Sequence, residues 1–531
     1  MVVQDKDEIE NSSRRWWVLG VLVLSLLVVQ LDTTVLGVAV QRLSQPRPDG
    51  LGLTQGELLW AINAYTLVMA GMLLTTGALA DRLGRKRVLL GGLVLFAVAS
   101  LWCAFSVTGP MLIAGRAVLG LAAALVTPTT LAIITQVFSK QERPRAIGIW
   151  SGGVGIAVAV GPLVGGLLLD HLWWDSIFLV NVPVVAVAII AMAVIVPESR
   201  NPRPGRFDVP GVLLSLLGMA LLVKGIIAGG DTGEWTSPQV WAVGSAGVLV
   251  LAVFVVWERR ATAPLLPLDW FRSRTFSGSI TVMTLAFFAM LGVTFTTAFY
   301  LLSLRRLSVL STGLLLLPLA LAQLTLSAWT PALARRFGAR VTGTFGMLLL
   351  TSALLLFASL DTGTPLWVPG FALFLIGTGI AFIMPSASAA IMASVPKERA
   401  GSASATSNAF RQVGGALGTA VLGAVLTGVY RAQITDHLDA LPAAVRDLAA
   451  SSIQATQAVL ESLGLQLPDA SAISTASDQA FTVGFHTSSL IGAAIALLGA
   501  VLAALVLTPR GGPTHDDAPQ PMADPAEADA P

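Results

Sequence analysis

The chain has 531 residues, of which 55% are hydrophobic and only 12% are charged, and its formal net charge is +2. A soluble protein carries about 25% charged residues, so this chain cannot cover a water-facing surface, and its exterior must face lipid. The small net charge argues against a nucleic-acid binder. One cysteine and four scattered histidines provide neither a disulfide framework nor a usual metal site. We therefore expect no enzyme and no cofactor.

Fourteen apolar stretches follow one another along the chain. Each is long enough to cross the ~30 Å hydrocarbon core of a membrane as a helix. The first does not resemble a signal peptide, because an acidic segment precedes it and no small-residue cleavage site follows. The sequence therefore predicts an all-α integral membrane protein. The expected spans are 17–40, 57–80, 88–106, 111–137, 144–169, 176–196, 209–229, 238–257, 276–304, 308–334, 341–360, 366–395, 401–430 and 479–507.

The basic residues indicate the orientation of these spans. With the N-terminus inside the cell, the cytoplasmic segments hold most of the 32 lysines and arginines, as the positive-inside rule requires. We expect a multi-pass protein of the plasma (inner) membrane with both termini in the cytoplasm.

The spans and their connections suggest five segments. They are a cytoplasmic tail (1–15), a six-helix bundle (16–200), two inserted helices (201–262), a second six-helix bundle (263–510) and a disordered acidic tail (511–531). The second bundle contains a long extracellular stretch, 431–478. Its apolar positions are compatible with two short helices that form a lid or hairpin, and equally with a partly ordered loop.

An internal repeat relates the two bundles at an offset of 257 residues. The stretch 120–128 leads to a Glu-Arg pair at 142–143 and then to a glycine-rich span, and the stretch 377–385 leads to the same pair at 398–399 and another glycine-rich span. Parallel halves of this kind place a substrate site between them near the membrane midplane and permit alternating access. The repeat therefore favours a transporter over a membrane anchor.

The cytoplasmic turn between spans two and three combines glycines, one acid and several basic residues. Glycines permit a tight turn, and the acid can accept a hydrogen bond from a helix N-terminus or pair with an arginine of the other half. The turn resembles the signature loop of the major facilitator superfamily, in which it acts as a cytoplasmic gate; a loop that only sets topology is the alternative. The residues concerned are Gly77, Asp81, Arg82, Gly84, Arg85 and Lys86.

Span five carries small residues at helical spacing and a Gly-Pro step. Small residues allow helices to approach closely, and generic tight packing would explain them too. The pattern also resembles the antiporter motif of superfamily members that exchange a substrate for protons. Its residues are Gly153, Gly161, Pro162, Gly165 and Gly166.

Two further motifs restrict the resemblance to one branch of the superfamily. Residues 31–35 (Leu-Asp-Thr-Thr-Val) and 408–415 (Asn-Ala-Phe-Arg-Gln-Val-Gly-Gly) resemble motifs of the fourteen-span drug–proton antiporters, and within them the actinobacterial antibiotic and multidrug exporters. The chain departs from the pattern at Gly37, Gln41 and Leu119. Exporters of quaternary ammonium compounds carry an acid where this chain has Asn63, and another in span thirteen, where it has none. A dicationic substrate is therefore disfavoured.

Charged groups inside the spans need a physical reason, because each costs ~2.5–3.5 kcal/mol on insertion scales. Asp32 lies about 24 Å from the cytoplasmic end of span one, and Arg116 lies about 9 Å from the outer end of span four. Because the hydrocarbon core is ~30 Å thick, the two residues lie at similar depth. Burial raises the pKa of a carboxyl group, whereas a nearby arginine lowers it. We therefore predict that Asp32 carries the transported proton and that Arg116 modulates it, with a static structural ion pair as the alternative.

The remaining polar residues have simpler explanations. Lys224 is expected to reach the membrane surface, and Arg411 to reach the surface or the other half. Further candidates for substrate contacts are Asn63, Tyr65, Gln323, Asn408 and Gln412.

Together these features predict a monomeric, proton-coupled antiporter. It would export hydrophobic small molecules, cationic ones among them, such as antibiotics, drugs and dyes, by alternating access. A transporter of one specific metabolite on the same fold is the alternative. The expected partners are the substrate, protons and the lipid bilayer, without nucleic acid.

Overall fold

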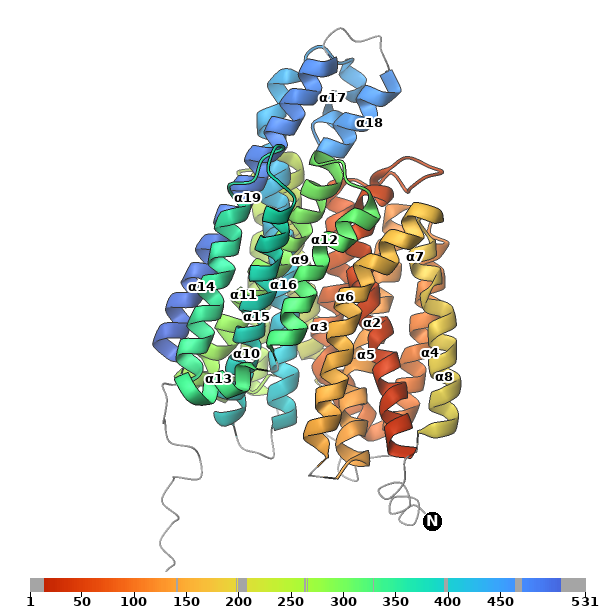
Figure 1. The fold of residues 1–531 in the computed structure, drawn as a ribbon, viewed down its shortest axis with the longest axis vertical. Helices are drawn as coiled ribbons and strands as arrows, with labels where there is room; N and C mark the ends of the chain where they lie inside the picture. Colours follow the sequence, from red (N-terminus) through yellow and green to blue (C-terminus); the bar gives the residue numbers. More distant parts are fainter. Residues whose placement is uncertain are drawn as a thin grey trace, which may run out of the picture.

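The computed structural model describes residues 14–139, 142–196, 198, 208–261, 264, 266–327, 329–395, 400–463 and 470–507. Within these ranges the chain forms helices and connections, with no β-strand (Figure 1). This is the expected all-α architecture, because a helix satisfies its own backbone hydrogen bonds in a medium without water. The expected tail 511–531, and all but two residues of the tail 1–15, lie outside the described ranges.

The first half of the chain forms one bundle (Figure 1). Its span six is interrupted at Val180, so that a short helix precedes the main one. The helices are α2 (Arg14–Ser44), α3 (Gln55–Leu83), α4 (Arg85–Ala104), α5 (Gly109–Val137), α6 (Arg143–His171), α7 (Ser176–Leu179) and α8 (Asn181–Ile195).

The second half forms a bundle beside it. The expected single span 308–334 is wrong, because its helix ends at Leu326 and a separate short helix follows. The elements are η1 (Leu268–Arg272), α11 (Arg274–Phe299), the π-helical turn η2 (Tyr300–Leu304), α12 (Val309–Leu326), α13 (Thr330–Phe337), α14 (Ala339–Phe357), α15 (Trp367–Ala393), α16 (Ala400–Ile434), η4 (Thr435–His437), α17 (Ala443–Ala449), α18 (Ile453–Leu463) and α19 (Ala470–Val506).

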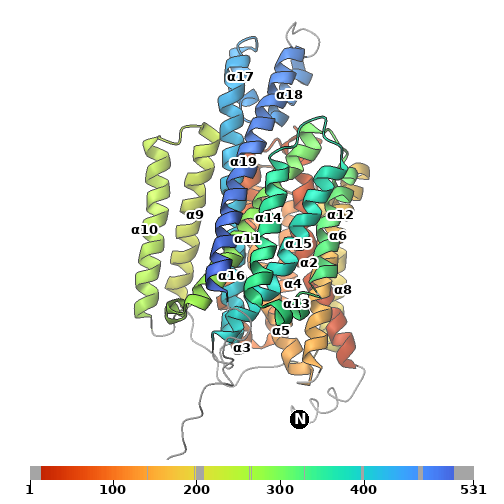
Figure 2. The ribbon, with the colours of Figure 1, turned by 60° about the vertical axis from the view of Figure 1, so that its left-hand side comes forward.

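The inserted helices α9 (Val209–Thr232) and α10 (Pro238–Arg260) form a hairpin at the side of the molecule (Figure 2). Glycines hold them close: a Cβ on Gly225 would lie 2.9 Å from Gly244 Cα. At one end the buried Asp208 carboxylate accepts hydrogen bonds from Gly211 N, at 3.0 Å, and from Trp257 Nε1, at 2.7 Å. The outer face of α10 exposes Trp241 and Leu249, as lipid contact requires.

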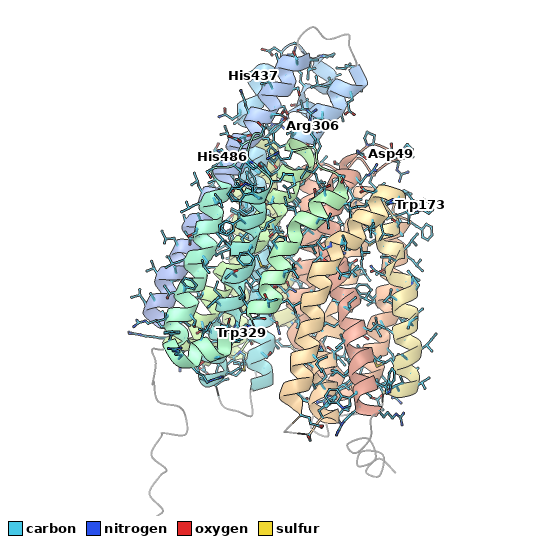
Figure 3. All side chains as sticks on the ribbon, viewed as in Figure 1. Asp49, Trp173, Arg306, Trp329, His437 and His486 are labelled. Atoms are coloured by element: carbon cyan, nitrogen blue, oxygen red, sulfur yellow. The ribbon has the colours of Figure 1, made fainter. Side chains whose placement is uncertain are left out.

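The described residues contain thirteen helical segments that are long and apolar enough to cross a membrane. The 29-residue helix α6 is a further helix of this length and corresponds to predicted span five. The two observations agree with the predicted fourteen spans. Trp173 and Trp329 are exposed at opposite ends of the bundle (Figure 3), where aromatic side chains meet a membrane interface. We call the end near Trp173 the outer end, following the orientation that the basic residues predict.

The internal repeat is visible in the backbone. Gly84 ends α3 with φ +109°, and Gly338 ends α13 with φ +90°, a conformation that glycine adopts without steric cost. A Cβ on Gly120 would strike the backbone of Tyr65, and a Cβ on Gly377 would strike the backbone of Leu319. Corresponding glycines thus set the same helix contacts in both halves, α5 on α3 and α15 on α12.

A small helical cap projects beyond the outer end of the bundle (Figure 1). Helices α16 and α19 have 35 and 37 residues, and at 1.5 Å per residue they are longer than the ~30 Å membrane core requires. Tyr430 Oη lies 2.6 Å from Thr456 Oγ1 and 2.8 Å from Ser477 Oγ, which joins α16, α18 and α19. The stretch 431–478 therefore contains a packed pair of short helices, and its residues 464–469 lie outside the described ranges.

Candidate functional site

A buried ion pair lies in the core of the first bundle. Asp32 on α2 and Arg116 on α5 are 3% and 1% exposed, and Arg116 Nη1 lies 2.5 Å from Asp32 Oδ2. Arg116 Nε also donates to the Ala61 carbonyl of α3 at 3.1 Å. The structure thus brings together the two charges that the sequence placed at similar depth.

The second oxygen of Asp32 also has a partner. Asn181, 1% exposed at the start of α8, donates from Nδ2 to Asp32 Oδ1 at 3.1 Å and lies 3.5 Å from Ser100 Oγ of α4. Asn181 was not among the residues predicted from the sequence. Its only signal was an amide side chain in the apolar run 177–187, beside Pro183. Both carboxylate oxygens are therefore held, one by a cation and one by a neutral donor.

Tyr65 of α3 completes this cluster. Its ring centroid lies 4.5 Å from Arg116 Cζ, a cation–π contact. Its hydroxyl donates to the Val29 carbonyl at 3.3 Å, and the side chain is buried. Tyr65, expected to contact substrate, thus supports the guanidinium of Arg116 in this structure.

The small residues of span five bring α6 against two neighbours. Within the first half, a Cβ on Gly153 would lie 2.6 Å from Val23 Cγ1, and one on Gly161 would strike Thr34. Gly165 is buried. At the outer end, a Cβ on Gly166 would lie 2.7 Å from Leu310 Cα of α12, in the other half.

The contact with α12 is reciprocal. A Cβ on Gly313 of α12 would lie 2.9 Å from the carbonyl carbon of Pro162 on α6. The backbones of the two halves therefore touch through a glycine from each side. We call this contact the outer seam: it consists of Pro162 and Gly166 of α6 and Leu310 and Gly313 of α12.

Two polar contacts join the halves nearer the midplane. Thr419 Oγ1 of α16 donates to Asn63 Oδ1 of α3 at 3.1 Å, and both side chains are buried. Gln412 Nε2 lies 3.1 Å from Met69 Sδ. These contacts and the glycine contacts of α6 with α12 join the two halves between the middle of the bundle and its outer end. Asn408 and Gln323 are half-buried on α16 and α12.

The predicted gate loop forms a tight turn at the cytoplasmic end. Arg85 Nη1 donates to the Ala132 carbonyl at 3.1 Å and to Gln136 Oε1 at 3.0 Å, which ties the turn to α5. Lys86 Nζ donates to the Ala193 carbonyl of α8 at 2.7 Å. Arg82 is exposed. Gly77 and Asp81 belong to α3, and the surroundings of Gly77 and of the Asp81 carboxylate lie outside what the structure describes.

Two other cations occupy spans. Lys224 on α9 is exposed, which agrees with a side chain that extends along the helix toward the membrane surface. Arg411 on α16 behaves differently: it is half-buried, and its Cζ lies 4.8 Å from the ring centroid of Phe287 on α11. Among the described residues Arg411 makes no ion pair or hydrogen bond with the other half, and its expected contact with the membrane surface stays a prediction.

Comparisons with known proteins agree with this architecture. The chain is 33% identical over 497 residues to the multidrug efflux pump LfrA of Mycolicibacterium smegmatis, covering 92% of this chain and 96% of that protein. It is 34% identical over 414 residues to the tetracenomycin C resistance and export protein of Streptomyces glaucescens, covering 78% and 76%. A bacterial homologue of the human lysosomal transporter Spinster has the same fold, with a TM-score of 0.65 at 17% identity over 94% of this chain and 99% of that one.

The sequence model of the Major Facilitator Superfamily matches residues 22–419. This range includes the Asp32–Arg116 cluster, the inserted helices and the midplane contact of Asn63 with Thr419. The chain belongs to the Major Facilitator Superfamily.

Proposed function

We propose that this protein exports hydrophobic small molecules, such as antibiotics, drugs and dyes, across the plasma membrane in exchange for protons. The observation that carries the proposal is a buried carboxylate, Asp32, whose two oxygens are held by Arg116 and Asn181 inside a bundle that pairs with a second one. The names of the relatives above, a multidrug efflux pump and an antibiotic export protein, support the substrate class.

Protonation of Asp32 would couple the cluster to the movement of the halves. A protonated carboxyl no longer compensates the charge of Arg116, and removing one partner of a buried pair costs about 3–5 kcal/mol. The arginine and the helices that hold it then favour another arrangement. Release of the proton to the cytoplasm restores the carboxylate, its pair with Arg116 and the present conformation. The proton therefore moves with the change of access from outside to inside, and the substrate moves with the reverse change.

The proton gradient gives this cycle its direction. In the present conformation the glycine contact joins α6 and α12 at the outer end, so we expect substrate to enter from the cytoplasm or the inner leaflet. Proton entry from outside requires that the seam opens. Export of substrate and import of protons then use the same two conformations in opposite order.

The decisive experiment measures both fluxes in everted vesicles from cells that express the full chain. With an acidic lumen, ethidium should accumulate inside the vesicles, and its addition should make the lumen more alkaline. A protonophore should abolish both signals. Ethidium uptake without proton movement would contradict exchange, and no uptake by a verified membrane-inserted protein would redirect the search to a single metabolite.

Asn181→Leu is expected to slow transport about tenfold. A hydrogen bond to a charged group contributes ~1.5–3 kcal/mol, and leucine leaves Asp32 Oδ1 without its donor inside the bundle. The initial rate of ethidium uptake at equal amounts of inserted protein measures the effect. Ser100→Ala removes only the longer 3.5 Å contact of Asn181 and is the matched control. An unchanged rate in Asn181→Leu would limit Asn181 to packing.

A further inference from the structure

The exchange described above uses Asp32 and Arg116 and gives no role to the two other cations in spans, the exposed Lys224 and the half-buried Arg411. Arg411 is the twelfth residue of α16, which begins at Ala400, so it lies ~16 Å from the cytoplasmic end of the helix. An arginine at this depth costs ~2.5–3.5 kcal/mol on insertion scales unless something compensates its charge. The surroundings of Arg411 show what could do so.

No acidic side chain of the second half can serve as its counter-ion within the membrane. From residue 274 to residue 507 the described acidic residues lie in connections, in the cap or near the outer end of α19; they are 361, 436, 439, 447, 461 and 478. The acidic residues 398 and 469 lie outside the described ranges. In the first half, the carboxylate of Asp32 is already held on both oxygens. Among the side chains that the structure describes, none compensates the charge of Arg411.

Its hydrogen-bonding groups are also unused. Among the residues that the structure describes, Arg411 makes no hydrogen bond and no ion pair, and its Nε is buried without an acceptor. A guanidinium carries five N–H donors in a planar fork. A buried donor without a partner costs about 1–3 kcal/mol, so a ligand that supplied acceptors here would gain that energy on binding.

The residues next to Arg411 place its helix against both halves. A Cβ on Gly414 would strike the backbone of Thr284 on α11, so α16 and α11 pack closely one turn beyond Arg411. The guanidinium of Arg411 lies across the ring of Phe287. The next residue, Gln412, contacts Met69 of the other half, and Asn408, one turn toward the cytoplasm, is half-buried.

We propose that Arg411, Phe287 and Asn408 form a substrate subsite for the anionic oxygen, a carboxylate or phenolate, of an aromatic molecule. Arginine binds two oxygens of a planar anion with two parallel hydrogen bonds, Phe287 offers a ring edge for the aromatic body, and the Asn408 amide supplies a further donor. The subsite rests on the proposed export function and extends its substrates: aromatic anions join hydrophobic molecules and monocations such as ethidium. Dications, which two membrane acids would select, stay disfavoured.

The test measures binding to the purified full chain in lipid nanodiscs by titration calorimetry. The probes are 2-naphthoate and its neutral analogue 2-naphthylmethanol, which share one ring system. The wild type is expected to bind naphthoate about tenfold more tightly than the alcohol. In Arg411→Gln this ratio falls to about one, and in Arg411→Lys it takes an intermediate value, because the charge remains and the fork is lost.

Two controls keep the result interpretable. Lys224→Gln removes an exposed membrane cation and should leave the tenfold ratio unchanged, and Phe287→Leu should weaken both probes together because it removes only the ring. An equal preference for naphthoate in the wild type and in Arg411→Gln overturns the subsite, as does a wild type without any preference. If Arg411→Gln does not fold, Arg411→Lys and Phe287→Leu decide the question.

The outcomes of the binding test and the export test can be told apart. Suppose that the wild type binds naphthoate selectively, that Arg411→Gln abolishes this selectivity, and that the protein moves no probe and no proton in vesicles. This result refutes the proposed exporter and leaves the subsite. Proton-driven export together with an unaltered naphthoate ratio in Arg411→Gln refutes the subsite alone.

Discussion

Asp32→Asn is expected to lower proton-driven export at least 100-fold without preventing folding. Asparagine has nearly the same shape, and its amide oxygen still accepts from Arg116, so the site stays filled. It cannot bind and release a proton, however, and the guanidinium loses its compensating charge. Because Arg116 is 1% exposed, water cannot replace that charge. The variant should remain in one arrangement of the two halves, whatever the pH.

The measurement is ethidium uptake and lumen alkalinisation in everted vesicles, at equal amounts of inserted protein. Asp436→Asn is the matched control, because Asp436 lies in η4 at the base of the outer cap and far from the cluster. It should transport like the wild type. Full proton-coupled export by Asp32→Asn would refute the role of Asp32 and reduce its pair with Arg116 to a structural contact.

Gly166→Ala is expected to lower turnover about tenfold or more and to shift the protein toward a conformation that is open to the outside. The added methyl would lie 2.7 Å from Leu310 Cα and 3.0 Å from Leu310 N. Both atoms are backbone and cannot rotate away, so the outer ends of α6 and α12 must separate. Gly313→Ala should act alike, because its Cβ meets the Pro162 backbone from the other side.

The shift can be followed with a cysteine placed in the seam. In a Cys103→Ser background, Val309→Cys carries a thiol at the start of α12, and its labelling by a membrane-impermeant maleimide reports outer opening. Adding Gly166→Ala should raise the labelling rate severalfold. Gly91→Ala is the control, because a Cβ there has no neighbour within 4 Å. Equal labelling in all three proteins would show that this seam does not govern outer access.

Much of the fold could be predicted because lipid restricts the sequence at every position. Apolar runs of span length indicate each membrane helix directly, and the repeated glycines at 120 and 377 revealed the relation between the halves. The failure at 308–334 has a local cause. Its hydropathy continues past Leu326, while the chain breaks its helix before Thr330, and hydropathy contains no information on such a break.

The candidate site could be predicted only in part. Asp32 and Arg116 were identified because charges are rare in spans, and helix rise gave both their depth. The depth of a residue in the membrane does not tell in which direction its side chain points around the helix axis. Asn181 was therefore missed, although its amide holds Asp32, and Tyr65 was expected to contact substrate but supports Arg116.

The sequence alone determined the membrane environment of this protein, its number of spans, its internal repeat and its superfamily, since each follows from residue type and spacing along the chain. The tertiary structure decided which polar groups meet. Asp32 accepts hydrogen bonds from residues that are 84 and 149 positions away in the sequence, and Asn63 accepts one from Thr419, which is 356 positions away. Such pairs depend on the rotation of each helix about its axis. Backbone contacts at glycines such as Gly120, Gly166 and Gly414 set that rotation, and it exists only once the helices have packed.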